Sequence, residues 1–143
     1  MRTLFLIPLL ALVGAGCGGG STQDRSYPLD GAFRQTRVGG SACPGSANDS
    51  LGNTVGCGSD YRITFNASAG TYRYYDAGTD TTLYQGTYYV LGATLYLVIN
   101  EGGGSTRTVP QPLRYSEPEL TLLSKKADSS QLDIAFARLS GSL

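Results

Sequence analysis

The sequence offers few side chains that could carry out catalysis, because it contains no histidine. Histidine is the usual general base and a common metal ligand, and many serine and cysteine nucleophiles depend on it. Carboxylate pairs remain, but Asp76 with Asp80 and Glu117 with Glu119 fall in expected turns, where solvated carboxylates are normal. We therefore expect a protein that is not an enzyme, with no catalytic residue, no metal and no cofactor.

Two polar segments have the composition of a calcium-binding loop and of a phosphate-binding loop, but not the spacing or the neighbouring elements of such loops. Asn48, Asp49, Ser50 and Asn53 supply oxygen ligands, but their spacing does not match an EF-hand calcium loop. The Gly102–Gly104 run precedes an expected strand, whereas a phosphate loop leads into a helix. A plain polar loop and a flexible hairpin turn are the better interpretations.

Ten tyrosines and no tryptophan are the most informative remaining chemical feature. Several tyrosines share an expected inward face with apolar neighbours, and a tyrosine hydroxyl can serve as a polar handle in an apolar cavity. A packed core without a cavity explains the same pattern. The candidates for a cavity lining are Tyr61, Ile63, Phe65, Tyr72, Tyr74, Tyr84, Tyr88 and Leu97.

Short strands, and no major helix, are expected to position these side chains. From Tyr27 onward apolar and polar residues alternate, and Gly, Asn, Asp and Pro interrupt the pattern at short intervals. The expected strands are Gly31–Val38, Tyr61–Asn66, Thr71–Asp76, Thr82–Leu91, Thr94–Asn100, Ser105–Val109, Leu113–Ser116, Glu119–Ser124 and Gln131–Leu139.

The period of two also predicts the core, because a strand buried on one side places every second residue inside. With no helix to cover it, the sheet must close into a barrel or fold into two layers. The prediction from the period is an all-β fold, an antiparallel meander of about eight strands that takes one of these two forms. Further core residues expected from the period are Gly86, Val90, Leu95, Ile99, Leu120, Leu122, Leu132, Ile134 and Phe136.

The N-terminus has the composition of an export signal. Arg2 gives it a positive start, and the apolar run Leu4–Val13 is too short to span a bilayer. Cys17 follows small residues in a way that resembles the bacterial lipobox, in which a lipid-modified cysteine becomes the first mature residue. Gly14 stands where that pattern prefers leucine, so ordinary cleavage after Ala15 is an alternative, as is a buried N-terminal helix.

The expected domain organisation follows from these segments. Residues 1–16 form the signal peptide, residues 17–26 a lipidated flexible tether, and residues 27–143 the barrel domain. Export leads to an oxidising compartment, in which Cys43 and Cys57 can pair and leave Cys17 for acylation. The bridge would contribute about 3 kcal/mol by constraining the unfolded chain. Two free cysteines in a reduced protein are the alternative.

Charge gives no indication of a nucleic-acid partner. Eleven basic residues balance eleven acidic ones, and neither sign clusters along the sequence. Nucleic-acid binding through a basic face is therefore not supported, and neither is electrostatic attraction to anionic lipid.

Three segments together resemble the lipocalin-like lipoproteins of bacteria, over Leu29 to Leu139. They are Leu29–Phe33, the hairpin between Phe65 and Tyr72, and Gly86–Val90 followed by Leu95–Leu97. The resemblance implies a small up-and-down barrel with a reduced lipocalin motif.

In lipocalins an arginine of the last strand lies across a tryptophan that follows a glycine in the first strand. Here Gly31, Phe33 and Arg138 occupy the corresponding places, and no tryptophan is present. The resemblance implies that Arg138 stacks on Phe33 at the closed end. An exposed arginine at the strand end is the alternative.

The sequence thus favours a membrane-anchored, non-enzymatic lipoprotein whose barrel binds a small apolar or amphipathic ligand. The alternative is a protein-interaction or inhibitor-type module with a packed barrel and no ligand. Its outer face or its long Gly39–Gly58 loop would contact a protein partner that the sequence does not identify. Gly18 rather than aspartate after Cys17 resembles lipoproteins sorted to the outer membrane, facing the periplasm or the cell surface.

Overall fold

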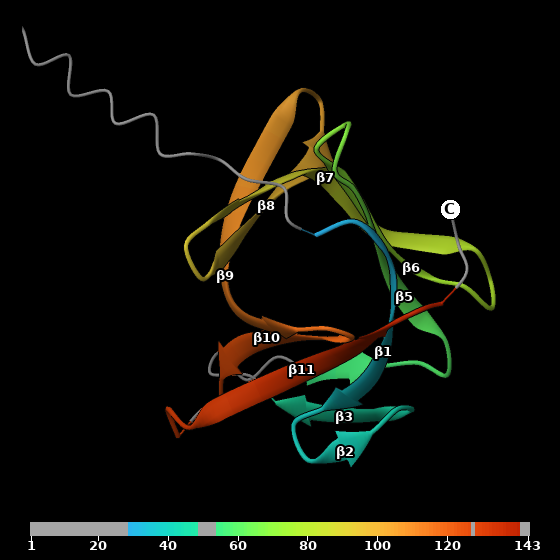
Figure 1. The fold of residues 1–143 in the computed structure, drawn as a ribbon, viewed down its shortest axis with the longest axis vertical. Helices are drawn as coiled ribbons and strands as arrows, with labels where there is room; N and C mark the ends of the chain where they lie inside the picture. Colours follow the sequence, from blue (N-terminus) through green and yellow to red (C-terminus); the bar gives the residue numbers. More distant parts are fainter. Residues whose placement is uncertain (1–28, 49–53, 127, 141–143) are drawn as a thin grey trace, which may run out of the picture.

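The computed structural model describes residues 29–48, 54–126 and 128–140, and every regular element in them is a β-strand (Figure 1). The expected signal peptide, the tether and Cys17 lie outside the described residues. In the described part of the chain no helix is long and apolar enough to cross a bilayer. The strands are β1 (Gly31–Val38), β2 (Ser41–Ala42), β3 (Gly45–Asn48), β4 (Thr54–Cys57), β5 (Tyr61–Asn66), β6 (Thr71–Asp76), β7 (Thr81–Leu91), β8 (Thr94–Gly102), β9 (Ser105–Ser116), β10 (Glu119–Lys125) and β11 (Gln131–Arg138).

Eight of these strands form a closed antiparallel barrel. They follow one another as a meander from β5 to β11, and β1 closes the circle by pairing with β5 on one side and β11 on the other. Phe33 of β1 lies opposite Ile63 of β5 and opposite Arg138 of β11. The predicted all-β barrel is confirmed.

Two predicted strands, Ser105–Val109 and Leu113–Ser116, are one continuous strand, β9. Pro110 and Pro112 lie between the two predicted ranges, and proline cannot donate to a ladder. The Leu113 amide donates to Ala93, on the β8 side, so the nitrogens of the two prolines face the β10 side. Pairing with β10 begins only at Leu113, and neither proline interrupts a ladder there.

The connection Gly39–Gly58, predicted as a plain loop, contains three short strands. β2 pairs with the last two residues of β1, and β3 pairs with β4 as a separate two-stranded hairpin. Glycine, serine, alanine and asparagine dominate this segment, and such residues give no strand signal. Figure 1 shows β2 and β3 beside the end of β1.

The main core fills the half of the barrel nearest the start of β1, which we call the base. Most predicted core residues contribute to it, and several others pack against it partly buried. The buried members of the predicted set are Ile63, Phe65, Tyr72, Tyr88, Val90, Leu95, Leu120, Leu122 and Phe136, and the partly buried members are Tyr74, Leu97, Ile99 and Ile134.

A second, smaller cluster holds the hairpin against the opposite end, which we call the mouth. Val38, Cys57 and Leu132 are buried there, and Tyr61 and Val55 pack against them. The predicted disulfide is present, joining Cys43 to Cys57 with their Cα atoms 5.4 Å apart. The hairpin is therefore tied to the barrel by both a covalent bond and apolar packing.

Gly86 of β7 generates a prediction about barrel stability. A Cβ atom at this position would lie 1.8 Å from the Val98 carbonyl oxygen, a backbone atom of the β8 ladder. We expect Gly86→Ala to lower the free energy of unfolding by about 2 kcal/mol, because the two strands must separate. Urea unfolding followed by tyrosine fluorescence measures this change.

Gly40→Ala is the matched control, because its Cβ meets nothing within 4 Å. Equal unfolding midpoints for the two variants would contradict the close approach of β7 and β8.

Candidate functional site

The base of the barrel is closed by a network around Arg138. Its guanidinium carbon lies 4.7 Å from the centroid of the Phe33 ring, which is the predicted contact. Nη1 donates a hydrogen bond to the Asp30 carbonyl oxygen (2.6 Å), and Nη2 donates to the Tyr115 hydroxyl (2.8 Å). Nε lies 2.7 Å from the Glu117 carboxylate. One side chain thus joins the first strand, the last strand and the turn before β10.

Aromatic side chains fill the space above this network. Phe33 is fully buried and packs edge-on against Phe65 and Tyr115, at centroid distances of 6.0 and 6.2 Å. The Tyr88 hydroxyl donates to the carbonyl oxygen of Leu29, whose side chain is also buried. The centre of the base is consequently packed with aromatic side chains.

A cleft of about 630 Å³ lies at the mouth, where the hairpin faces β5, β6 and β7. Leu83 and Tyr84 are 38% and 51% exposed, so apolar and aromatic surface faces solvent there. The residues that line the cleft are Thr54, Val55, Gly56, Tyr61, Tyr74, Leu83 and Tyr84.

Three tyrosine rings form one side of this mouth cleft. Tyr84 stacks parallel to Tyr74 at a centroid distance of 6.4 Å, and Tyr61 meets Tyr74 edge-on at 5.8 Å. The prediction that Tyr84 belongs to the core is wrong, because its side chain is half exposed. Period-two patterning gives the face on which a residue lies, but not its depth along the barrel.

The predicted cavity residues therefore separate into two groups. Tyr61, Tyr74 and Tyr84 line the mouth cleft. Ile63, Tyr88 and Leu97 pack in or against the core below it. Phe65 and Tyr72 belong to the core as well, and they also border a second hollow of about 460 Å³, whose other lining residues are mostly polar.

Gln35 lies beside the cleft residue Tyr74 and was missed by the sequence analysis. It is 2% exposed, and its amide oxygen accepts a hydrogen bond from the Tyr74 hydroxyl (2.7 Å). Its amide nitrogen has no hydrogen-bond partner among the described residues. The available signal was the period of two, which places this polar residue on the same inward face as Phe33.

Burial controls the ionisation of Tyr72 and Tyr74. It raises the pKa of Tyr72 to about 12, an effect that the nearby Arg107 guanidinium partly opposes. Burial also raises the pKa of Tyr74, and the neighbouring Tyr61 and Tyr84 add to the rise. Arg107 itself forms an ion pair with Glu101 (2.6 Å). The hydroxyls of Tyr72 and Tyr74 therefore stay neutral at physiological pH.

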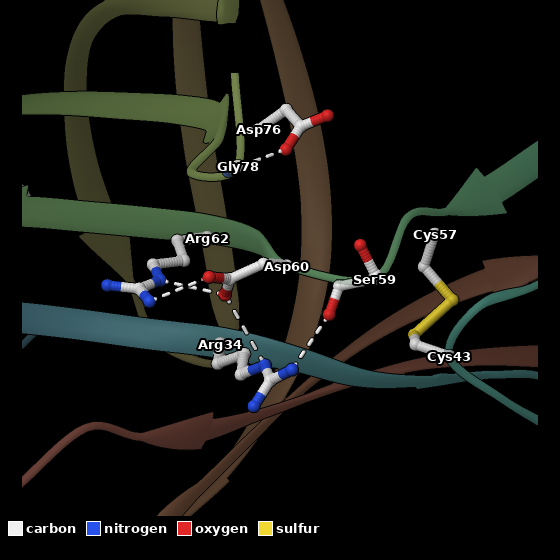
Figure 2. A network of polar contacts seen from close by, with 8 residues as sticks. All are labelled: Arg34, Cys43, Cys57, Ser59, Asp60, Arg62, Asp76 and Gly78. Atoms are coloured by element: carbon white, nitrogen blue, oxygen red, sulfur yellow. Dashed lines mark hydrogen bonds and ion pairs between the residues drawn. A yellow bond between two sulfur atoms is a disulfide. The ribbon is translucent and has the colours of Figure 1, made fainter. Parts of the chain in front are cut away.

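An ionic network on the outer surface holds the segment that joins the hairpin to β5 (Figure 2). Arg62 donates two hydrogen bonds to the Asp60 carboxylate, at 2.9 and 2.7 Å. Arg34 of β1 lies 3.4 Å from the same carboxylate and donates to the Ser59 carbonyl oxygen (2.7 Å). The Arg62 hydrogen bonds lower the pKa of Asp60. Because Cys57 directly precedes this segment, the network and the disulfide fix the same wall of the cleft.

Metal-binding chemistry has no support in the described ranges, which contain no group of three or more His, Cys, Asp or Glu suited to an ion. Asn48, which belongs to the segment of oxygen-bearing side chains noted in the sequence, accepts a hydrogen bond from the Thr54 hydroxyl across the hairpin. Asp49, Ser50 and Asn53 of that segment lie outside the described residues.

Comparison with known proteins gives one match to a family. The model of the lipocalin-like domain family matches residues 31–122, which is more than half of the chain. This range runs from the start of β1 into β10, so it includes the hairpin and the mouth cleft. A search of curated proteins gave no significant match.

Tyr72 generates a prediction about alkaline stability. Its pKa of about 12 in the folded state exceeds the value near 10 expected in an unfolded chain. The neutral hydroxyl therefore contributes stability below about pH 10, and this contribution is lost as the pH rises toward about 12. We expect Tyr72→Phe to lose less stability than the wild type across this range, as measured by urea midpoints at successive pH values.

Thr71→Val is the control, since it removes a neighbouring exposed hydroxyl that does not titrate. If the urea midpoint of Tyr72→Phe fell with pH as steeply as that of the wild type, burial would not raise the pKa of the Tyr72 hydroxyl.

Proposed function

The chain belongs to the lipocalin-like domain family, and on this premise we propose that the barrel binds a small, mainly apolar or aromatic molecule in the mouth cleft. The observation that carries the proposal is the tyrosine-lined cleft of about 630 Å³ at the end opposite the packed base. Small-molecule sites commonly measure about 300–1,000 Å³ and combine apolar walls with a few polar groups.

The walls of the cleft suit a flat, apolar ring. Tyr74 and Tyr84 lie parallel, with 7° between their planes, and Leu83 adds aliphatic surface. Aromatic rings favour offset-stacked or edge-on contacts, which a ring compound can make with both tyrosines. The supporting residues come from strands, and strands hold a site more rigidly than a free loop does.

The hairpin gives the cleft a preformed fourth wall. Val55 packs on the small cluster around Val38 and Leu132, and the disulfide closes the hairpin at its foot. A wall that is already ordered loses less conformational entropy when a ligand binds. This preorganisation supports a binding role for the connection.

Tyr84 provides a direct test of binding at the mouth. N-phenyl-1-naphthylamine, whose fluorescence rises in apolar sites, serves as the probe. We expect Tyr84→Ala to weaken its binding by about tenfold, because the exposed stacking platform is lost, which corresponds to about 1.4 kcal/mol.

Tyr96→Ala is the matched control. It removes a ring that is also stacked on a tyrosine, Tyr89 at 4.9 Å, but on the outer face of β8, since its neighbours Leu95 and Leu97 point inward. Equal weakening by both variants, or no binding by the wild type, would contradict a ligand site at the mouth.

The proposal also includes export and attachment to the outer membrane through an acylated Cys17, with the barrel facing the periplasm or the cell surface and no enzymatic activity. The lipobox-like residues before Cys17 support this part, together with a disulfide that suits an oxidising compartment. We expect the full chain, expressed in a bacterial host, to incorporate labelled palmitate, and Cys17→Ser to abolish the label. Persistent labelling of Cys17→Ser would contradict the anchor.

A further inference from the structure

Two buried polar groups inside the barrel have unused hydrogen-bonding capacity. Gln35 is 2% exposed and Tyr72 is 4% exposed, yet no described residue bonds to the amide nitrogen of Gln35 or to the hydroxyl of Tyr72. Buried polar groups in native proteins are nearly always satisfied, so each such group calls for an explanation. Tyr72 borders the second hollow and not the mouth cleft, so a ligand that enters through the mouth bears only on the Gln35 amide.

The Gln35 amide is bonded to the cleft residue Tyr74, although Gln35 itself does not line the cleft. Tyr74 donates to its oxygen (2.7 Å), and the ring of Tyr74 lines the cleft. A glutamine amide has two donor hydrogens on nitrogen and an acceptor oxygen. Because the amide oxygen already accepts this bond, the group of Gln35 that lacks a partner is its NH₂, which can only donate hydrogen bonds.

The surroundings of Gln35 disfavour a charged partner. Phe136 lies directly opposite it on β11, and the nearest hydrogen-bonding neighbour is the neutral Tyr74 hydroxyl. A buried charge without a counter-ion is strongly unfavourable, so the group that meets Gln35 is a neutral acceptor.

We propose that the ligand is an aromatic carbonyl compound, a ketone, ester or quinone, whose carbonyl oxygen accepts a hydrogen bond from the Gln35 amide nitrogen while its ring stacks on the mouth tyrosines. This inference rests on the proposed function and adds the chemical class of the ligand to it. The carbonyl end enters first, and the ring remains between Tyr61, Tyr74 and Tyr84. The ring gives affinity, and Gln35 discriminates carbonyl compounds from hydrocarbons.

The test uses two probes of the same shape. 2-Acetylnaphthalene carries a carbonyl oxygen where 2-isopropylnaphthalene carries a methyl group. Their affinities for the barrel domain are measured by displacement of N-phenyl-1-naphthylamine. We expect Gln35→Leu to lower the affinity for the acetyl probe by about tenfold relative to its effect on the isopropyl probe, which is the loss of about one hydrogen bond.

A second measurement on the wild-type protein avoids any effect of the substitution on folding. The side-chain NH₂ resonances of Gln35 are followed by ¹H–¹⁵N NMR. We expect a downfield shift with the acetyl probe and none with the isopropyl probe.

The outcomes separate the two proposals. If both probes bind, but Gln35→Leu weakens them equally and the Gln35 resonances do not respond, the inference is overturned while ligand binding at the mouth stands. The Gln35 amide then binds only water. If the wild type binds the dye but neither probe displaces it, the inference is overturned and the proposed function stands; if the wild type does not bind the dye, both fail.

Discussion

The pairing of β1 with β11 is the constraint on which the rest of the structure depends. It converts a meander with two exposed edges into a closed barrel. Arg138 secures this closure at the base, because its guanidinium lies over Phe33 of β1 while it bonds to Asp30 and Tyr115. An arginine can hold several partners at once because its donors form a rigid planar fork. Any opening of the β1–β11 seam would expose Phe33 and the aromatic layer around it.

A packed base leaves the mouth as the end where the proposed ligand enters. Since Phe33, Phe65 and Tyr88 fill the lower half, the cleft lies at the other end, between the tyrosines of β5 to β7 and the hairpin. The disulfide and the Asp60 network both restrain the end of the connection that leads into β5, so the hairpin is a fixed wall. The barrel is therefore closed at its base, and the restrained hairpin at the mouth leaves the tyrosine surface of the cleft exposed to solvent.

Much of this arrangement follows from the sequence, and the failures have identifiable causes. The period of two predicted Ile63, Phe65, Tyr72 and Tyr88 as inward residues, and the family resemblance placed Arg138 over Phe33. Depth along the barrel has no sequence period, so Tyr84 was assigned to the core although it lies at the rim. Gln35 was overlooked because it lies in the polar stretch Arg34–Arg37, which hides the inward face that it shares with Phe33. The β3–β4 hairpin was missed because it is held by a disulfide and by tertiary packing, not by strand propensity.

The central claim is that the barrel is closed at its Arg138 end and receives a ligand only at its hairpin end. Fluorine NMR of the domain labelled with 3-fluorotyrosine, titrated with 2-acetylnaphthalene, tests it most directly, because tyrosines mark both ends. The account predicts that the resonances of Tyr61, Tyr74 and Tyr84 shift, while that of Tyr115, packed against Phe33 at the base, does not. A shift of Tyr115 equal to those at the mouth would contradict it.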